Sequence, residues 1–294
     1  MKVFNQKIII KFLLLILFTN CEKEVEIDLP KYQPELVLNC LFSQDAVFKV
    51  HLSKTAPILN DFPVIVREAI VQLYENELFI EELTFDGNIY TSTILPKTNK
   101  NYHIKVNTPE FENITAYDYT PSKPNLISVA FNENAYTDEE GYEMGQLTIE
   151  FKDNPNKKNY YEIVFFVKDN NSFFTPYYDE KNNDPVLLNE EILAYEPESL
   201  MFSDELFNGT AYTLKINSGN LFDSNDEPSE LNFIFRHITE NYYKYKKRLI
   251  LHKYNQEHDV WDGVGEPISM YTNIENGYGI FAGYSEITRI IKSN

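Results

Sequence analysis

Apolar and polar residues alternate along most of residues 35–120, which is the period of a half-buried β-strand. Phe48, Val50 and Leu52 form one such run, and Tyr102, Ile104 and Val106 form another. Turn-forming residues such as Asp86-Gly87-Asn88 separate the runs. The pattern contains about seven short strands and no helical period, so it predicts an immunoglobulin-like or transthyretin-like β-sandwich over residues 31–121.

A Pro-bounded segment, Thr120-Pro121-Ser122-Lys123-Pro124, follows this predicted sandwich. Proline ends strands, so we expect a linker here and a larger β-rich domain over residues 124–294. The run Tyr160–Val167 is apolar on both faces and predicts a central strand. Residues 169–200 are rich in Asn, Asp, Glu and Pro, and they predict a long excursion from the sheet.

One amphipathic helix is predicted near residues 239–253. Thr239 is a suitable N-cap, and Tyr242, Tyr245 and Leu249 share one helical face. Five basic residues cluster on the same segment: Lys244, Lys246, Lys247, Arg248 and Lys253. They indicate either a solvated helix face, a dock for an acidic partner, or salt bridges with the acidic loops.

The N-terminus predicts secretion and lipid anchoring. Residues 1–20 carry lysines before a short apolar run, Phe12–Phe18, which is typical of a signal peptide and too short for a membrane span. Cys21 stands where a bacterial lipoprotein carries its acylated cysteine, although Asn20 occupies a position that usually holds a small residue. We therefore expect lipid attachment at Cys21, an acidic tether over residues 21–30, and membrane binding through the lipid.

Charge and cysteine content narrow the possible functions. The chain has 26 Lys and Arg against 45 Asp and Glu, a net charge of −19, which opposes binding to nucleic acid. Cys40 alternates with Leu38 and Phe42 on an apolar strand face, so we expect a buried, inert thiol. If Cys21 were not lipidated, a Cys21–Cys40 disulfide would be the alternative.

No catalytic constellation is present in the sequence, and we predict no enzymatic activity and no cofactor. His51 and His103 fall on the outward faces of predicted strands, where we expect solvated side chains. Three acidic clusters offer oxygen ligands for calcium, but solvated loops are the expectation for each of them. These clusters are Asp138-Glu139-Glu140, Asp179-Glu180 with Asp184, and Asp223-Ser224-Asn225-Asp226-Glu227.

Several segments together carry a family resemblance: the strand Leu36–Phe42, and the segments 202–209, 238–245 and 273–284. With the lipoprotein-like start, the mature chain resembles the Bacteroidetes outer-membrane lipoprotein family called domain of unknown function 4249. The resemblance implies an outer-membrane lipoprotein at the cell surface, with a TonB-dependent transporter barrel as its expected partner. We therefore expect a binding or accessory component of nutrient uptake. The alternative is a free-standing glycan- or peptide-binding surface protein.

The last of these segments is the candidate site. Half of the ten glycines lie between Gly263 and Gly283, and Asn276-Gly277 suits a tight turn. Two interpretations remain open: a turn that closes the second domain, or a loop that contacts a ligand or partner. The residues of that loop are Asn273, Glu275, Asn276, Gly277, Tyr278, Phe281 and Tyr284. A transporter partner should present an apolar or aromatic patch on a rigid face, whereas a glycan or peptide binder should have a concave, aromatic-lined cleft.

Overall fold

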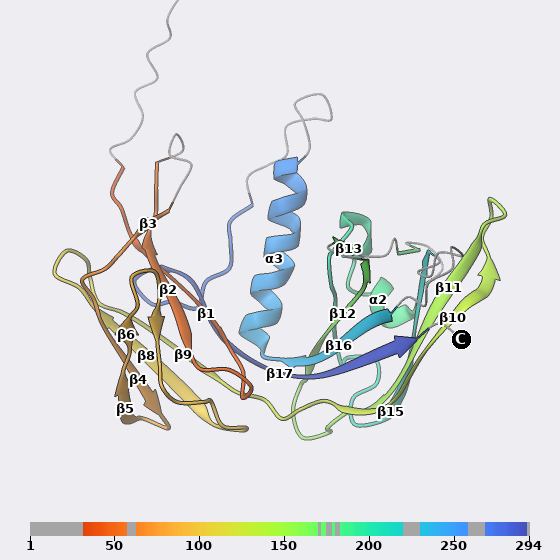
Figure 1. Ribbon diagram of the computed structural model, residues 1–294, viewed down its shortest axis with the longest axis horizontal. Coiled ribbons are helices and arrows are strands. Elements are labelled where there is room, and N and C mark those ends of the chain that lie inside the picture. Colours follow the sequence, from red (N-terminus) through yellow and green to blue (C-terminus); the bar gives the residue numbers. More distant parts are fainter. Residues whose placement is uncertain are drawn as a thin grey trace, which may run out of the picture. The chain divides into compact units, whose positions relative to one another are not determined.

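Two layered β-structures in this chain share one long C-terminal strand. The computed structural model describes residues 32–57, 63–169, 172–174, 178–179, 183–219, 230–257 and 268–292. The predicted signal peptide, Cys21 and most of the acidic tether lie outside these residues. Pro34–Asn294 form one compact unit, and the mostly-β prediction is confirmed (Figure 1).

The first sandwich is built from residues 36–119. Its four-stranded sheet has the order β5-β4-β8-β9, with β4 (Ile70–Glu75), β5 (Leu78–Glu82), β8 (Asn101–Asn107) and β9 (Ile114–Tyr119). The facing sheet contains β1 (Leu36–Phe42), β2 (Lys49–Lys54), β3 (Val64–Ile65), β6 (Thr84–Phe85) and β7 (Tyr90–Thr91). Alternate residues of these strands, such as Leu38, Val50 and Ile104, are buried in one core between the two sheets.

Cys40 lies in that core, so the expected buried thiol is confirmed. Its side chain is 2% exposed, and burial raises its pKa to about 12. The thiol is free and protonated at neutral pH, which makes it a poor nucleophile.

The second layered structure is built from most of the remaining chain. A three-stranded sheet of β10 (Asn125–Thr137), β11 (Glu143–Lys152) and β15 (Ala211–Gly219) faces the strands β12, β13, β14, β16 and β17. These strands span Tyr160–Asp169, Ser172–Phe174, Leu200–Ser203, Glu230–Ile238 and Tyr278–Lys292. Phe151, Phe165 and Phe235 are buried between the sheets. As expected, β12 is a central strand, paired with both β14 and β16.

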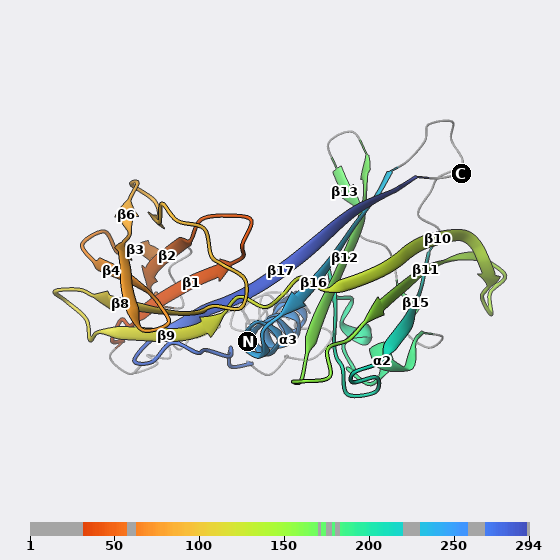
Figure 2. The same ribbon diagram turned by 90° about the horizontal axis from the view of Figure 1, so that it is seen from below.

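Strand β17 joins the two sheets into one ten-stranded sheet. Its first half pairs in parallel with β1, from Tyr278 opposite Val37 to Gly283 opposite Phe42. Its remainder pairs with β16 in the antiparallel sense (Figure 2). The predicted boundary at residues 121–124 falls between β9 and β10, where the Pro121 carbonyl accepts a hydrogen bond from Ser285 Oγ of β17 at 2.6 Å.

Helix α3 (Glu240–Glu257) covers the face of this sheet opposite the three-stranded sheet (Figure 1). The Thr239 hydroxyl accepts a hydrogen bond from the Tyr242 amide, as the N-cap prediction requires. Tyr242 packs on Ile238 and Ile280 in a third apolar cluster. The excursion after β12 holds two short helical turns, α2 (Pro185–Leu188) and η1 (Leu193–Tyr195). None of the helices in the described ranges is long and apolar enough to span a membrane.

Candidate functional site

Four ring side chains form a row across the outer face of the four-stranded sheet. Neighbouring strands place them directly opposite one another: Phe79 pairs with Tyr74, Tyr74 with His103, and His103 with Tyr117. The residues that alternate with them, such as Leu73 and Ile104, point into the core. We call these four residues the aromatic row.

The rings of the aromatic row are in contact. Their centroids are 5.6 Å apart for Tyr74–Phe79, 5.3 Å for Tyr74–His103 and 3.8 Å for His103–Tyr117. The last pair is stacked, with 16° between the ring planes. The two ends of the row are open to solvent, because Phe79 is 55% exposed and Tyr117 is 52% exposed. An exposed aromatic strip held on a sheet is the type of surface that binds a partner.

His103 lies at the covered centre of the row. The expectation of a solvated His103 is wrong: the residue is on the outward face, but it is 2% exposed because the Tyr117 ring lies over it. Burial lowers its pKa, and nearby Lys105 lowers it further. Its Nε2 lies 2.5 Å from Thr115 Oγ1, and its Nδ1 has no hydrogen-bond partner in the described part of the chain. The imidazole is therefore neutral at pH 7 and adds ring surface rather than charge to the row. His51 is exposed, as expected.

Strand β5 carries Phe79 at the edge of the sheet. Leu78 and Ile80, which precede and follow Phe79 along this edge strand, are exposed as well. Two exposed carboxylates, Glu77 and Glu82, flank them on the same hairpin. The rim of the aromatic row also carries a positive charge, since Lys105 Nζ lies 4.9 Å from the centroid of the Tyr74 ring.

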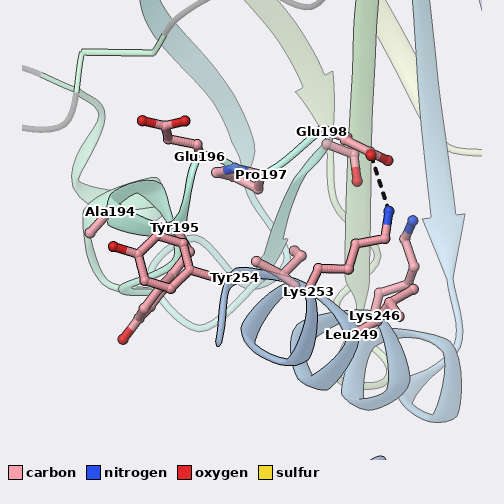
Figure 3. Close-up of a pocket in the computed structure, with 11 residues that line it drawn as sticks. Ala194, Tyr195, Glu196, Pro197, Glu198, Lys246, Leu249, Lys253 and Tyr254 are labelled. Atoms are coloured by element: carbon pink, nitrogen blue, oxygen red, sulfur yellow. Dashed lines mark hydrogen bonds and ion pairs between the residues drawn. The ribbon is translucent and has the colours of Figure 1, made fainter. Parts of the chain in front are cut away.

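A second candidate is a pocket of about 380 Å³ between α3 and residues 194–199. Figure 3 shows Lys246, Leu249 and Lys253 of α3 facing the segment that carries Glu196 and Glu198. Lys253 Nζ and Glu198 Oε1 are paired at 3.0 Å across it. We call this the α3 pocket.

A buried carboxylate lies beneath the α3 pocket. Glu162 of β12 is fully buried on the sheet face that α3 covers, and its Oε2 accepts hydrogen bonds from Arg236 Nη1 and Tyr242 Oη, both at 2.8 Å. Its Oε1 accepts one from Ser199 Oγ at 2.7 Å. Burial raises the pKa of Glu162, but the charges of Lys246 and Arg236 outweigh it and hold the pKa below its usual value. The group is therefore a carboxylate at neutral pH.

A second buried glutamate holds α3 further along. Glu190 accepts a hydrogen bond from Lys247 Nζ at 2.8 Å, another from the Tyr243 hydroxyl, and a third from the Ser203 amide at 2.9 Å. Three alternatives were predicted for the basic cluster, and the structure shows salt bridges. Lys246 pairs with Glu162, and Lys247 pairs with Glu190. The two partner carboxylates come from β12 and from the turn after α2.

The predicted loop residues 273–284 are brought together where β17 begins. The Asn273 side chain hydrogen-bonds both the amide and the carbonyl of Phe281, and Glu275 pairs through its backbone with Thr115 of β9. Phe281 is buried in the first core, and the Tyr284 ring lies under the Arg236 guanidinium. These contacts fix the turn that precedes β17, as the first of the two interpretations predicted.

The exposed part of that turn consists of Glu275, Asn276 and Tyr278. Asn276 has φ of 60° and donates to the Asn113 carbonyl, and Gly277 packs on the Leu36 carbonyl. Contact with a ligand or partner stays a prediction for the exposed residues. Phe281 is fully buried and therefore cannot contact a ligand or partner.

The acidic clusters use their oxygens within the fold where the structure describes them. Asp138 Oδ1 accepts the amides of Glu140 and Tyr142, and Asp184 caps α2 by accepting the Val186 amide. No group of three or more His, Cys, Asp or Glu that could hold a metal occurs among the described residues. The cluster 223–227 and Cys21 lie outside them.

The aromatic row was missed in the sequence, although alternation places Tyr74 and Tyr117 on outward faces. Only strand register brings these residues together, and register between β4, β8 and β9 depends on long-range pairing. The α3 pocket left one sign in the sequence, which is the cluster of basic residues on the predicted helix.

Almost the whole chain matches one family model. The family described as Domain of unknown function (DUF4249) matches residues 22–290, which include the aromatic row and the α3 pocket. No curated protein matches the sequence.

Proposed function

The chain belongs to the domain of unknown function 4249 family, and from that premise we propose that it is an outer-membrane lipoprotein acting as a binding or accessory component. Cys21 carries the lipid, and the folded part is at the cell surface. Its partner is a TonB-dependent transporter barrel engaged in nutrient uptake.

The aromatic row is the single observation that supports a docking role. Contacting rings on neighbouring strands stabilise the sheet, but the two half-exposed ends leave aromatic surface that a partner can cover. Interfaces concentrate Tyr and Phe at their centre and polar residues at their rim, and this row has charged residues of both signs around it, Glu77, Glu82 and Lys105. The complementary partner surface is apolar at its centre, with charged residues that match this rim.

Site-specific photo-crosslinking in intact cells tests this proposal. Benzoylphenylalanine replaces Phe79 or Tyr117 in the aromatic row, and the matched control replaces Tyr142, which is also well exposed but precedes β11 in the other layered structure. We expect positions 79 and 117 to give one adduct with an outer-membrane barrel and position 142 to give none. Adducts without a barrel, or the same adduct from position 142, would overturn the docking role.

Anchoring is tested separately. Two or three acyl chains hold a protein stably on a bilayer at about 0.8 kcal/mol per buried methylene, so Cys21→Ala should release the protein into the soluble fraction. Retention of Cys21→Ala in the membrane fraction would contradict the anchor and leave the crosslinking result to be judged by itself.

A further inference from the structure

We propose that the α3 pocket binds a small zwitterion with an apolar side chain, of the chemical class of free α-amino acids. The proposal rests on residues separate from the aromatic row and does not depend on the docking role.

Lys246 supplies the position for the ligand's carboxylate. Its Nζ forms an ion pair with Glu162 Oε1 at 3.6 Å, which is beyond hydrogen-bond distance, and the Glu162 oxygens accept their hydrogen bonds from Ser199, Arg236 and Tyr242. The ammonium has no hydrogen-bond acceptor in the described ranges, and its side chain is 23% exposed at the pocket wall. A cation with open donors in a recess binds an anionic oxygen by charge-assisted hydrogen bonds.

Glu196 and Glu198 supply the position for the ligand's ammonium group. Glu196 ends η1 in the left-handed conformation, with φ of 44°, and its amide is fixed on the Leu193 carbonyl. This fixed backbone holds Glu196 at the wall of the pocket. Glu198 is paired with Lys253, but exposed pairs contribute about 0–1 kcal/mol and exchange readily with a ligand.

The charges that line the pocket are balanced, with two lysines and two glutamates. A ligand with only a positive or only a negative charge would leave either the two lysines or the two glutamates without a counter-charge. A zwitterion offers one charge to the lysines and the opposite charge to the glutamates. In Figure 3 the charged groups of Lys246 and Lys253 lie on one side, and the rings of Tyr195 and Tyr254 lie on the other.

The apolar wall sets the side chain of the ligand. Leu249, Ile250 and Pro197 line the pocket, and the rings of Tyr195 and Tyr254 meet edge to face with centroids 5.0 Å apart. A volume of about 380 Å³ lies at the small end of ligand sites. This volume accommodates one amino acid with an aromatic or branched side chain.

Titration calorimetry on the folded protein tests the proposal with three probes that share one ring: L-phenylalanine, phenylacetate and 2-phenylethylamine. We expect L-phenylalanine to bind at least tenfold tighter than either probe that lacks one charge. Equal affinity for the three probes, or no binding of L-phenylalanine at millimolar concentration, would overturn it.

Two variants locate the site. Lys246→Gln should weaken L-phenylalanine binding at least tenfold, whereas Lys244→Gln, on the exposed side of the same helix and paired with Glu240, should not change it. Because Lys246→Gln also affects Glu162, Leu249→Trp serves as a second variant that fills the pocket without touching the carboxylate, and it should abolish binding. Unchanged affinity in both pocket variants, with native far-ultraviolet circular dichroism, would exclude the pocket.

Discussion

The Arg236 guanidinium donates a hydrogen bond from Nη1 to Glu162 Oε2 at 2.8 Å, and the pair lies beneath α3. Arg236 also donates from Nε to Glu286 of β17 at 2.8 Å, so one side chain links β12, β16 and β17. Tyr242 and Lys246 bring α3 to the same carboxylate. A buried ionic group adds little net stability over a packed apolar core, but it fixes the orientation of the elements that share it.

Arg236→Met should destabilise the protein by about 3–5 kcal/mol, because it leaves the buried Glu162 carboxylate without its closest counter-charge. Urea unfolding followed by circular dichroism measures the change. The double variant Glu162→Leu/Arg236→Met should cost less than the sum of the two single variants, since neither charge is then left alone.

Lys244→Met is the matched control for the Arg236 prediction. Its pair with Glu240 is exposed and spans one helical turn, so its loss should cost no more than about 0.5 kcal/mol. If Arg236→Met were as mild as Lys244→Met, the network would not be what holds α3 on the sheet.

Gly279→Ala should break the parallel pairing of β1 with β17. Gly279 has φ of 107°, and a Cβ atom there would lie 2.0 Å from the Leu38 carbonyl oxygen of β1. Gly87 has φ of 106° but open space around it. Gly87→Ala therefore carries only the conformational cost of about 1–3 kcal/mol, and thermal unfolding should show a clearly larger loss for Gly279→Ala. Equal losses would mean that β17 can move away from Leu38 without cost.

Alternation was sufficient to predict the longer strands of the first sandwich, such as β1, β2 and β8, because each of them buries one face. It predicted Leu38 and Cys40 inside, and the apolar run Tyr160–Val167 as central. It could not predict that β17 pairs with both β1 and β16, since pairing partners far apart in the sequence leave no local signal. Gly279 was the trace of the pairing with β1, because it packs on the Leu38 carbonyl, whereas Gly283 packs on the Tyr119 carbonyl of β9.

The candidate sites show the same limit. His103 was placed on the correct face, but its burial depends on Tyr117, whose position opposite it is a matter of register. Glu162 interrupts an apolar run, and nothing in that run indicates that Arg236 and Lys246 surround it. Polar groups that meet only through tertiary structure are therefore the part of this fold that the sequence alone conceals.

Tyr117→Ala should raise the pKa of His103 toward its ordinary value. Burial is the main cause of the lowered pKa. The Tyr117 ring stacks on the imidazole, so its removal should admit water and weaken this effect. Titration of the imidazole by nuclear magnetic resonance measures it, with Tyr142→Ala as the control that should leave it unchanged. An unaltered His103 pKa in Tyr117→Ala would mean that the ring does not shield the imidazole in solution.

Asp118 places a titratable group where β9, β17 and the start of α3 meet. Its Oδ2 accepts hydrogen bonds from Thr239 Oγ1 at 2.7 Å and from the Gly283 amide at 3.3 Å. Burial raises the pKa of Asp118 to about 7, although these hydrogen bonds and the Tyr119 amide oppose the shift.

Asp118→Asn should therefore change how stability depends on pH. Because the folded-state pKa lies above the unfolded one, the stabilising contribution of protonated Asp118 is complete below about pH 4 and is lost as pH rises through about 7. The free energy of unfolding of Asp118→Asn minus that of the wild type should increase across this range by a few kcal/mol, since one pKa unit is worth about 1.4 kcal/mol. Asp86→Asn is the control and should leave the difference flat over the same range, because the Ile89 and Asn88 amides lower the pKa of Asp86 and so move its titration below pH 4. Urea titrations between pH 4 and 8 measure both differences, and a flat curve for Asp118→Asn would mean that its carboxylate stays ionised in the fold.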